Sequence, residues 1–288
     1  MIAVIAGTLT AIIWTISTLT SARASRLIGA PSTVAGVAFV GLVATIPLLA
    51  TAPLPTAADM PQMPWLLLAG AGNILGLLLN YGALRRGRVS IVAPIASTEG
   101  AIAATIAILA GEPVTAALLI ALSLVVTGVV LTAYGPEGDT EGRDPGASER
   151  RGGPLFLAMA VGAAMLFGAS LFAVGHASAL VPAPWIVAAA RIFGVVFIAL
   201  PLLVTGRLRM TRAALPFVVV CGLAEVLGFL TITWGSRDSI AVTAVLSSQF
   251  AVLTVIVSMF LGERVRRHQL AGALLTGVGV AAVTLVHL

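Results

Sequence analysis

Three ionisable side chains lie deep within apolar stretches of the sequence: Glu99, Arg191 and Glu225. A charge in the hydrocarbon core of a membrane is costly unless it faces a polar cavity or a partner, so such residues mark functional sites by default. Desolvation disfavours the charged form of a carboxyl group, which makes Glu99 and Glu225 candidates for proton coupling. The forked guanidinium of Arg191 suits the carboxylate or phosphate of a substrate. The alternative is a structural ion pair between Arg191 and Glu225.

Uncharged polar residues accompany these groups near the middle of two apolar stretches. Ser97 and Thr98 stand directly before the first acid, and Ser248 and Gln249 occupy the positions 151 residues later. Pro94 removes one backbone hydrogen bond and would bend the helix beside them. We therefore expect both polar pairs to contribute to a substrate-binding site.

Aromatic and amide residues add further candidates. Trp14 lies in the middle of the first apolar stretch, away from the headgroup level where tryptophan is usually found, and is also expected to bind substrate. With Phe167 it would form aromatic walls of a cavity, although simple packing explains both residues equally well. Asn73, Asn80 and Thr231 are weaker candidates, because hydrogen bonds between helices account for them as readily.

Motifs for other chemistries are absent from the sequence. A phosphate-binding loop of the form GxxxxGK[ST] cannot exist, because the chain contains no lysine. The three histidines, His176, His268 and His287, have no metal-ligand spacing. We also find no Ser-His-Asp set, so we expect no cofactor, no metal and no enzymatic activity.

Composition places the chain in a membrane. It is 59% hydrophobic and only 9% charged, with a mean hydropathy of +1.10, far from the roughly 25% charged composition of soluble domains. The net charge of +5 comes from arginines spread over separate short loops, which argues against nucleic-acid binding. The expected partners are therefore the lipid bilayer and a small-molecule substrate.

We expect an all-α integral membrane protein with ten transmembrane helices, arranged as two inverted-topology repeats of five. The first repeat is residues 1–134, a charged Gly/Pro-rich linker is 135–153, and the second repeat is 154–288. The expected spans are 2–21, 32–51, 64–84, 90–110, 115–134, 154–175, 184–204, 213–234, 240–261 and 268–287.

The repeat is visible in the sequence itself. Gly111, Glu112, Val114 and Gly128 recur as Gly262, Glu263, Val265 and Gly279. An odd number of crossings per repeat inverts the second copy relative to the first. The Gly-Glu pairs suit a turn followed by a helix N-terminus, which is a structural role. Small residues four apart, at Gly72 and Gly76 and at Ala273 and Gly277, permit close helix contact within the fold or between the protomers of a homodimer.

Arginine distribution predicts the orientation. Fourteen arginines fall in loops one, three, five, seven and nine, whereas Arg237 alone falls in an even-numbered loop. The positive-inside rule then places both termini outside. The arginine-only, Ala/Gly/Val-rich composition is typical of a GC-rich bacterial genome, so we expect a multi-pass protein of the bacterial inner membrane.

Two segments carry a resemblance to a known family. They read YGALRRGRVSIVAPIASTEGAIAATIAILAGEPVT at 81–115 and GSRDSIAVTAVLSSQFAVLTVIVSMFLGERVRRHQLAG at 235–272. Each resembles the helix pair with an LGE-type turn of the EamA-like branch of the drug/metabolite transporter superfamily. The resemblance covers two repeats of five spans. It implies alternating-access carriers of amino acids, other small metabolites or toxic organic compounds, frequently exporters, with both termini in the cytoplasm.

The sequence therefore predicts a secondary transporter, and the family resemblance favours an exporter of small metabolites such as amino acids or of drug-like organic compounds. Coupling of transport to protons is a further hypothesis. Two acids against one arginine near the midplane suit a cationic or zwitterionic solute better than a polyanion. The alternative is a membrane enzyme or a scramblase acting on lipid-linked substrates. A carrier moves an unaltered solute, whereas an enzyme yields a changed product.

Overall fold

The computed structural model describes residues 1–54, 57–87, 89–133 and 154–260, together with 271–272, 274–275, 277–279 and 282. Within these ranges the chain forms helices and no strands. The expected linker, the Gly262-Glu263 pair and most of the expected span at 268–287 lie outside the described residues.

Six helices in the described part of the chain are long and apolar enough to cross a membrane. They are α1 (Ile2–Ile28), α2 (Ala30–Thr51), α3 (Met63–Arg86), α8 (Pro154–Ser178), the continuous run from α9 to α10, and α11 (Leu215–Ser236). In that run, α9 (Ala183–Gly194) passes through a π-helical turn, η2 (Val195–Ala199), into α10 (Leu200–Val204). A short 3-10 helix, η1 (Ala57–Gln62), precedes α3, and α6 (Ala116–Ala133) is a further apolar helix.

Two of the expected spans are interrupted in their middles. The span expected at 90–110 is divided into α4 (Val89–Ala96) and α5 (Glu99–Leu109). The span expected at 240–261 is divided into α12 (Ile240–Ser247) and α13 (Phe250–Phe260). Both interruptions fall at the polar pairs singled out in the sequence, 151 residues apart. A bend of the helix beside Glu99 was expected from Pro94, whereas no break was expected in the span at 240–261.

Local hydrogen bonds explain both interruptions. Thr98 donates its backbone N–H to Ile95 at 3.2 Å and its hydroxyl to the same carbonyl at 2.8 Å. Ser248 Oγ donates to the carbonyl of Val245 at 2.6 Å. Such bonds to carbonyls three residues back tighten the helix into a 3-10 turn. Because position 245 is valine where the first pair has Pro94, proline is not what the two interruptions share.

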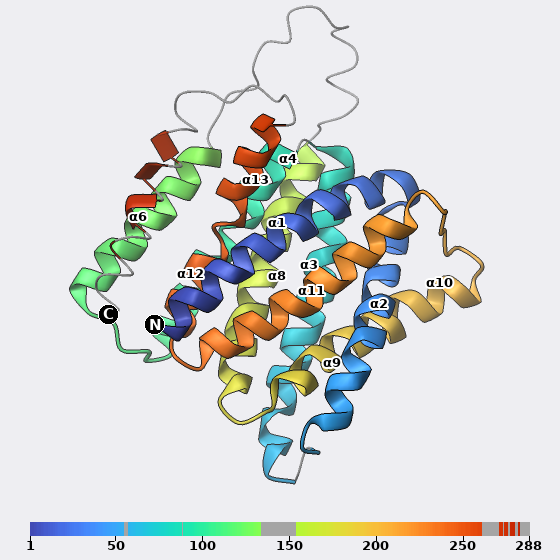
Figure 1. Cartoon of the computed structure of the whole chain (residues 1–288), viewed down its shortest axis with the longest axis horizontal. Coiled ribbons are helices and arrows are strands. Elements are labelled where there is room, and N and C mark those ends of the chain that lie inside the picture. Colours follow the sequence, from blue (N-terminus) through green and yellow to red (C-terminus); the bar gives the residue numbers. More distant parts are fainter. Residues whose placement is uncertain are drawn as a thin grey trace, which may run out of the picture.

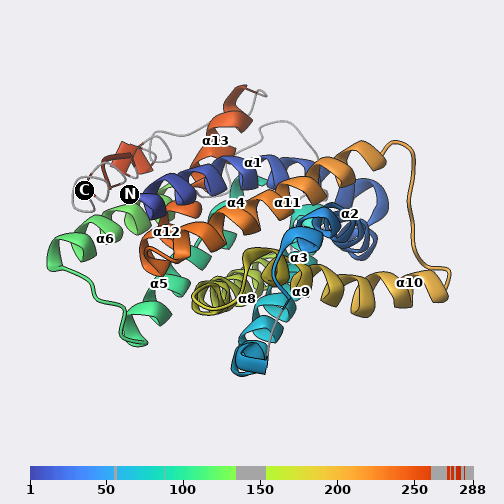
Figure 2. The same ribbon diagram turned by 60° about the horizontal axis from the view of Figure 1, so that its bottom comes forward.

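The long helices pack in pairs drawn from both halves of the chain. The most extensive packing joins α3 to α8 and α1 to α11, and Figures 1 and 2 both show α1 and α11 lying side by side with α3 and α8 on one side of them. Gly72 and Gly76 of α3 face α8, where added Cβ atoms would meet Ser170 at 3.1 Å and Phe167 at 2.6 Å. Gly100 of α5 likewise leaves room for the backbone of α12 at Ala244. The close contacts foreseen for Gly72 and Gly76 therefore occur within the fold.

Hydrogen bonds join loops that, by the expected spans, lie at the same end of the helices. At one end, Trp185 Nε1 donates to the carbonyl of Pro53 at 2.8 Å, and Arg237 Nε donates to that of Ser178 at 2.9 Å. At the arginine-rich end, the N–H of Arg209 donates to Ser32 Oγ at 3.0 Å. The bonds of Trp185 and Arg209 join loops from different halves, and that of Arg237 joins two loops of the second half.

Glu112 joins a loop of the first half to the start of α12 in the second half. Its carboxylate accepts a hydrogen bond from Ser239 Oγ at 2.6 Å and another from the N–H of Ala241 at 3.2 Å. Ser239 in turn caps α12 by accepting from the N–H of Val242 at 3.1 Å. Glu112 therefore supports the N-terminus of a helix in the other half of the chain, whereas Thr115 caps the helix that directly follows.

We expect Glu112→Gln to lower the stability of the folded protein by about 1 kcal/mol, because the charge at the N-terminus of α12 is lost. The change corresponds to a melting temperature lower by about 2–4 °C, measured by thermal unfolding in detergent. Thr127→Ala is the matched control, because Thr127 is exposed and bonds to the carbonyl of Ser123 in its own helix. Equal melting temperatures for the two variants would contradict the assigned role of Glu112.

Candidate functional site

A cavity of about 470 Å³ lies among α1, α3, α5, α8, α11 and α13. Its polar lining residues are Ser17, Thr18, Ser21, Asn73, Asn80, Tyr81, Glu99, Ser170 and Glu225, and its apolar ones are Trp14, Leu77, Phe167, Leu171, Phe229 and Phe250. Ser21 and Tyr81 stand near the ends of α1 and α3, close in sequence to the arginines of the adjoining loops. The cavity therefore extends from the middle of the helices towards the arginine-rich end.

Glu99 is the first residue of α5 and lies directly after the interruption. It is 4% exposed, and among the described residues its carboxylate has neither a hydrogen-bond partner nor an ion pair. The positive end of the α5 dipole is the only obvious local stabilisation of a negative charge there. Glu99 is thus an acid of the cavity wall that has no partner among the described residues.

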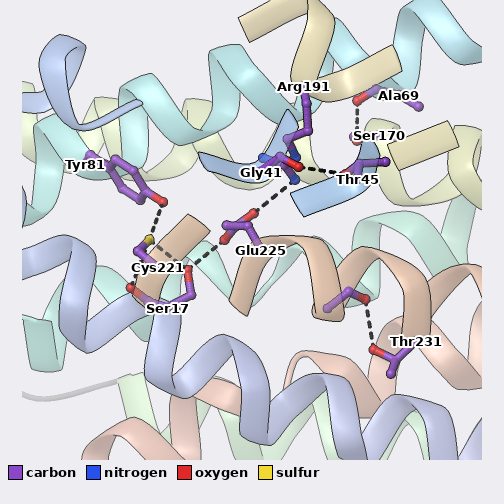
Figure 3. A network of polar contacts seen from close by, with 11 residues as sticks. Ser17, Gly41, Thr45, Ala69, Tyr81, Ser170, Arg191, Cys221, Glu225 and Thr231 are labelled. Carbon is purple, nitrogen blue, oxygen red and sulfur yellow. Dashed lines mark hydrogen bonds and ion pairs between the residues drawn. The ribbon is translucent and has the colours of Figure 1, made fainter. Parts of the chain in front are cut away.

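Glu225 has a different environment, although it lines the same cavity. One carboxylate oxygen accepts a hydrogen bond from Ser17 Oγ at 2.7 Å, and the other lies 3.6 Å from Arg191 NH2 (Figure 3). Arg191 is fully buried and stands behind Glu225, outside the set of residues that line the cavity. The ion pair considered in the sequence analysis therefore exists, and it largely cancels two of the three intramembrane charges.

The surroundings of Arg191 explain how a guanidinium fits within the helices. Gly41 of α2 leaves the necessary room, since a Cβ at that position would lie 2.7 Å from Cδ of Arg191. On the other side, the guanidinium carbon lies 5.1 Å from the ring centroid of Phe229, a cation–π distance. Its three nitrogens nevertheless have no hydrogen-bond partner among the described residues, so the charge of Glu225 is its main compensation.

The polar network continues from Ser17 to Tyr81 through the lone cysteine. Ser17 Oγ lies 3.4 Å from Cys221 Sγ, which in turn lies 3.2 Å from the hydroxyl of Tyr81 (Figure 3). Cys221 is buried and links hydroxyl groups on α1 and α3.

Aromatic residues form much of the remaining wall. Trp14 and Phe167 both line the cavity, and Trp14 also meets Phe250 edge to face at 6.3 Å. Glycines seat both rings. A Cβ at Gly228 would overlap the Nε1 edge of the Trp14 indole, and one at Gly76 would lie 2.6 Å from Phe167.

The two polar pairs occupy a flanking position. Ser97, Thr98, Ser248 and Gln249 all lie at the interruptions but are absent from the cavity lining. The residues that directly follow them, Glu99 and Phe250, do line the cavity. The pairs therefore position lining residues by shaping the backbone. Thr231, one of the weaker candidates, instead bonds to Thr10 at 2.7 Å, which is the helix-to-helix role given as its alternative.

Several lining residues escaped the sequence analysis, namely Thr18, Ser21, Ser17, Tyr81 and Ser170. A signal for three of them was present, because hydroxyl residues recur at spacings of three and four at positions 17, 18 and 21, in a span that also carries threonines at 8, 10, 15 and 20. This spacing places side chains on one helix face. Tyr81 and Ser170 stand alone in their segments and offered no such pattern.

Comparison with known proteins identifies the class of the first half. The family model described as "EamA-like transporter family" matches residues 1–134. These residues are therefore similar to the EamA-like transporter family. The family is part of the drug/metabolite transporter superfamily, as the resemblance implied. No curated protein matches the chain in sequence.

A solved crystal structure matches the chain beyond the EamA-like half. It aligns over 99% of this chain and 96% of its own, with a TM-score of 0.71 and 21% sequence identity. At this identity the similarity concerns the fold alone. The EamA-like half supplies the cavity residues on α1, α3 and α5, and the other half supplies those on α8, α11 and α13. The described residues therefore form a multi-pass membrane protein whose residues 1–134 match a transporter family, with a cavity lined by both halves.

We expect Arg191→Met to destabilise the protein by about 3–5 kcal/mol, because it leaves the carboxylate of Glu225 buried without its partner. The double variant Arg191→Met with Glu225→Gln removes both charges and should recover most of this loss. Thermal unfolding of the wild type and of the single and double variants in detergent measures the coupling. Additive losses would contradict an energetically significant ion pair.

Proposed function

We propose that this protein is a secondary carrier that moves a small organic solute through the central cavity by alternating access, with Glu99 coupling solute movement to protons. The observation that carries this proposal is the solitary acid Glu99 at the start of a half-helix, in the wall of a cavity shared by both halves of the chain.

Interrupted helices support a carrier. In secondary transporters, binding sites are commonly built where discontinuous helices meet near the bilayer midplane, at the interface of two repeats. Here α4 and α5 match α12 and α13 at the constant offset of 151 residues. We infer ten spans in two inverted repeats of five, with the last span at 268–287. The two polar pairs then form equivalent bends of the two repeats.

The distribution of contacts favours an exporter. Hydrogen bonds of Glu112 and Trp185 join the two halves at the end opposite the arginine-rich loops, against one of Arg209 at the arginine-rich end, and the cavity extends towards those loops through Ser21 and Tyr81. With the arginine-rich end in the cytoplasm and both termini outside, the cavity lies on the cytoplasmic side of Glu99. That arrangement suits the loading of a solute from the cell interior of a bacterium.

Charge balance gives the coupling step a physical basis. The Arg191–Glu225 pair is internally compensated, so the ionisation state of Glu99 decides the net charge of the cavity. A buried carboxylate without a partner is costly. The cavity can therefore change the side to which it opens at low cost when Glu99 holds a proton or when a cationic solute lies beside it. Exchange of the proton for the solute gives antiport.

We expect wild-type protein in proteoliposomes to accumulate at least one compound from a mixed panel of amino acids, nucleosides and organic cations when a proton gradient is imposed. Glu99→Gln should abolish the dependence on the gradient, because an amide cannot carry the proton. Glu112→Gln, a change at a residue that does not line the cavity, should retain that dependence. The readout is internal solute measured by mass spectrometry, with and without the gradient.

Gradient-driven accumulation that persists in Glu99→Gln would contradict the coupling role. Absence of flux for every compound, together with a chemically altered product or headgroup-independent lipid movement, would replace the carrier with an enzyme or a scramblase.

A further inference from the structure

Resting on the proposed function, we propose that the solute is an organic ammonium ion bearing N–H groups, a primary or secondary amine on an apolar body, and that Asn73 and Asn80 select it. The observation behind this inference is a set of buried acceptors without partners in the cavity wall.

The amide oxygens of Asn73 and Asn80 have no hydrogen-bond partner among the described residues. Both side chains are buried, at 4% and 7% exposure, and both line the cavity. A buried polar group left without a partner costs about 1–3 kcal/mol. A bound solute that donates hydrogen bonds to these oxygens would remove that cost, which makes the loaded cavity the state in which they are satisfied.

Helix geometry places the acceptors along one wall. Asn73 and Asn80 are seven residues apart on α3, so they share a face of the helix about 10 Å apart along its axis. The neighbouring face of α3 is fixed against α8 by Gly72 and Gly76. The packing of α3 on α8 therefore keeps both asparagines on the cavity side of the helix, and a donor in the cavity meets amide groups at two depths.

A solute with a single positive charge would match the charge of the cavity. Glu225 is compensated by Arg191, which lies behind it, and no basic side chain of the described residues lines the cavity. Glu99 remains the uncompensated group. An anionic group on the solute would face both carboxylates, whereas an ammonium group would be stabilised by Glu99 and would donate to the amide oxygens.

The apolar part of the wall fits the rest of such a solute. Trp14, Phe167, Phe229 and Phe250 line the cavity, so a large part of its wall is aromatic. The indole N–H of Trp14 lies against Gly228 and, like the two amide oxygens, has no hydrogen-bond partner among the described residues, while its ring adds aromatic surface. Aromatic surfaces and an acid alone would also suit a quaternary ammonium ion. The two amide oxygens make the difference, because a quaternary ion has no N–H to donate.

Matched pairs of amines test this selectivity directly. Butylamine, 2-phenylethylamine and tryptamine would each be compared with the N,N,N-trimethyl analogue, which keeps the charge and the apolar body but lacks N–H donors. Affinity for the full-length protein in nanodiscs would be measured by isothermal titration calorimetry. We expect the wild type to bind at least one primary amine about tenfold or more tightly than its trimethyl analogue, since a site built to hydrogen-bond a group rejects analogues that lack it.

Variants of the two asparagines locate the selectivity. Asn73→Leu and Asn80→Leu keep the approximate side-chain size and should reduce the preference towards one. Asn80→Asp keeps an acceptor and should retain the preference, which separates a lost hydrogen bond from a damaged fold. Thr105→Val is the control, because Thr105 is exposed on α5 and bonds to the carbonyl of Ala101 in its own helix.

Each other outcome has a distinct meaning. Equal binding of the primary and trimethyl compounds would overturn the inference and leave the carrier intact. Transport of a neutral or anionic compound from the mixed panel, with no amine binding, would do the same. Absence of both amine binding and solute flux would overturn the inference and the proposed function together.

Discussion

The structure depends on the cost of placing ionisable groups among apolar helices. Arg191 and Glu225 meet this cost together, at 3.6 Å, and the arrangement around them follows from that pairing. Gly41 must lack a side chain so that the guanidinium can pass α2, and Ser17 must face α11 so that the carboxylate has a second partner. One ion pair therefore constrains the relative positions of α1, α2, α9 and α11.

The same constraint separates the two acids of the cavity. Glu225 is held by a cation and a hydroxyl, and its charge is balanced by neighbours that do not leave it. Glu99 has no such neighbours among the described residues and is held only at the start of α5. Two acids in one cavity thus differ in what balances them, and of the two only Glu225 has an ion-pair partner among the described residues.

Sequence reasoning reached part of this arrangement for physical reasons. The cost of isolated charges in an apolar stretch pointed to Glu99, Arg191 and Glu225, and pairing was the natural alternative to a substrate contact. The all-helical class followed from composition, which is a property of whole segments. Family resemblance supplied the transporter class, and a family match now covers residues 1–134.

What sequence reasoning missed depended on short-range detail and on neighbours distant in the chain. The interruptions at Ser97–Thr98 and Ser248–Gln249 arise from hydrogen bonds to carbonyls three residues back, which hydropathy cannot reveal. Tyr81 enters the cavity because α3 packs on α8 and brings its hydroxyl to Cys221 on α11. No pattern within α3 itself encodes that meeting.

The glycines connect packing with function. Gly100 allows α5 to approach α12, and Gly76 and Gly228 seat the aromatic rings of Phe167 and Trp14. Each of these contacts joins the two halves of the chain. A cavity bounded by contacts between halves changes shape when the halves move relative to one another, whereas a cavity within one half would not. The residues that let the helices pack closely are therefore also the ones through which movement of the halves would reach the site around Glu99.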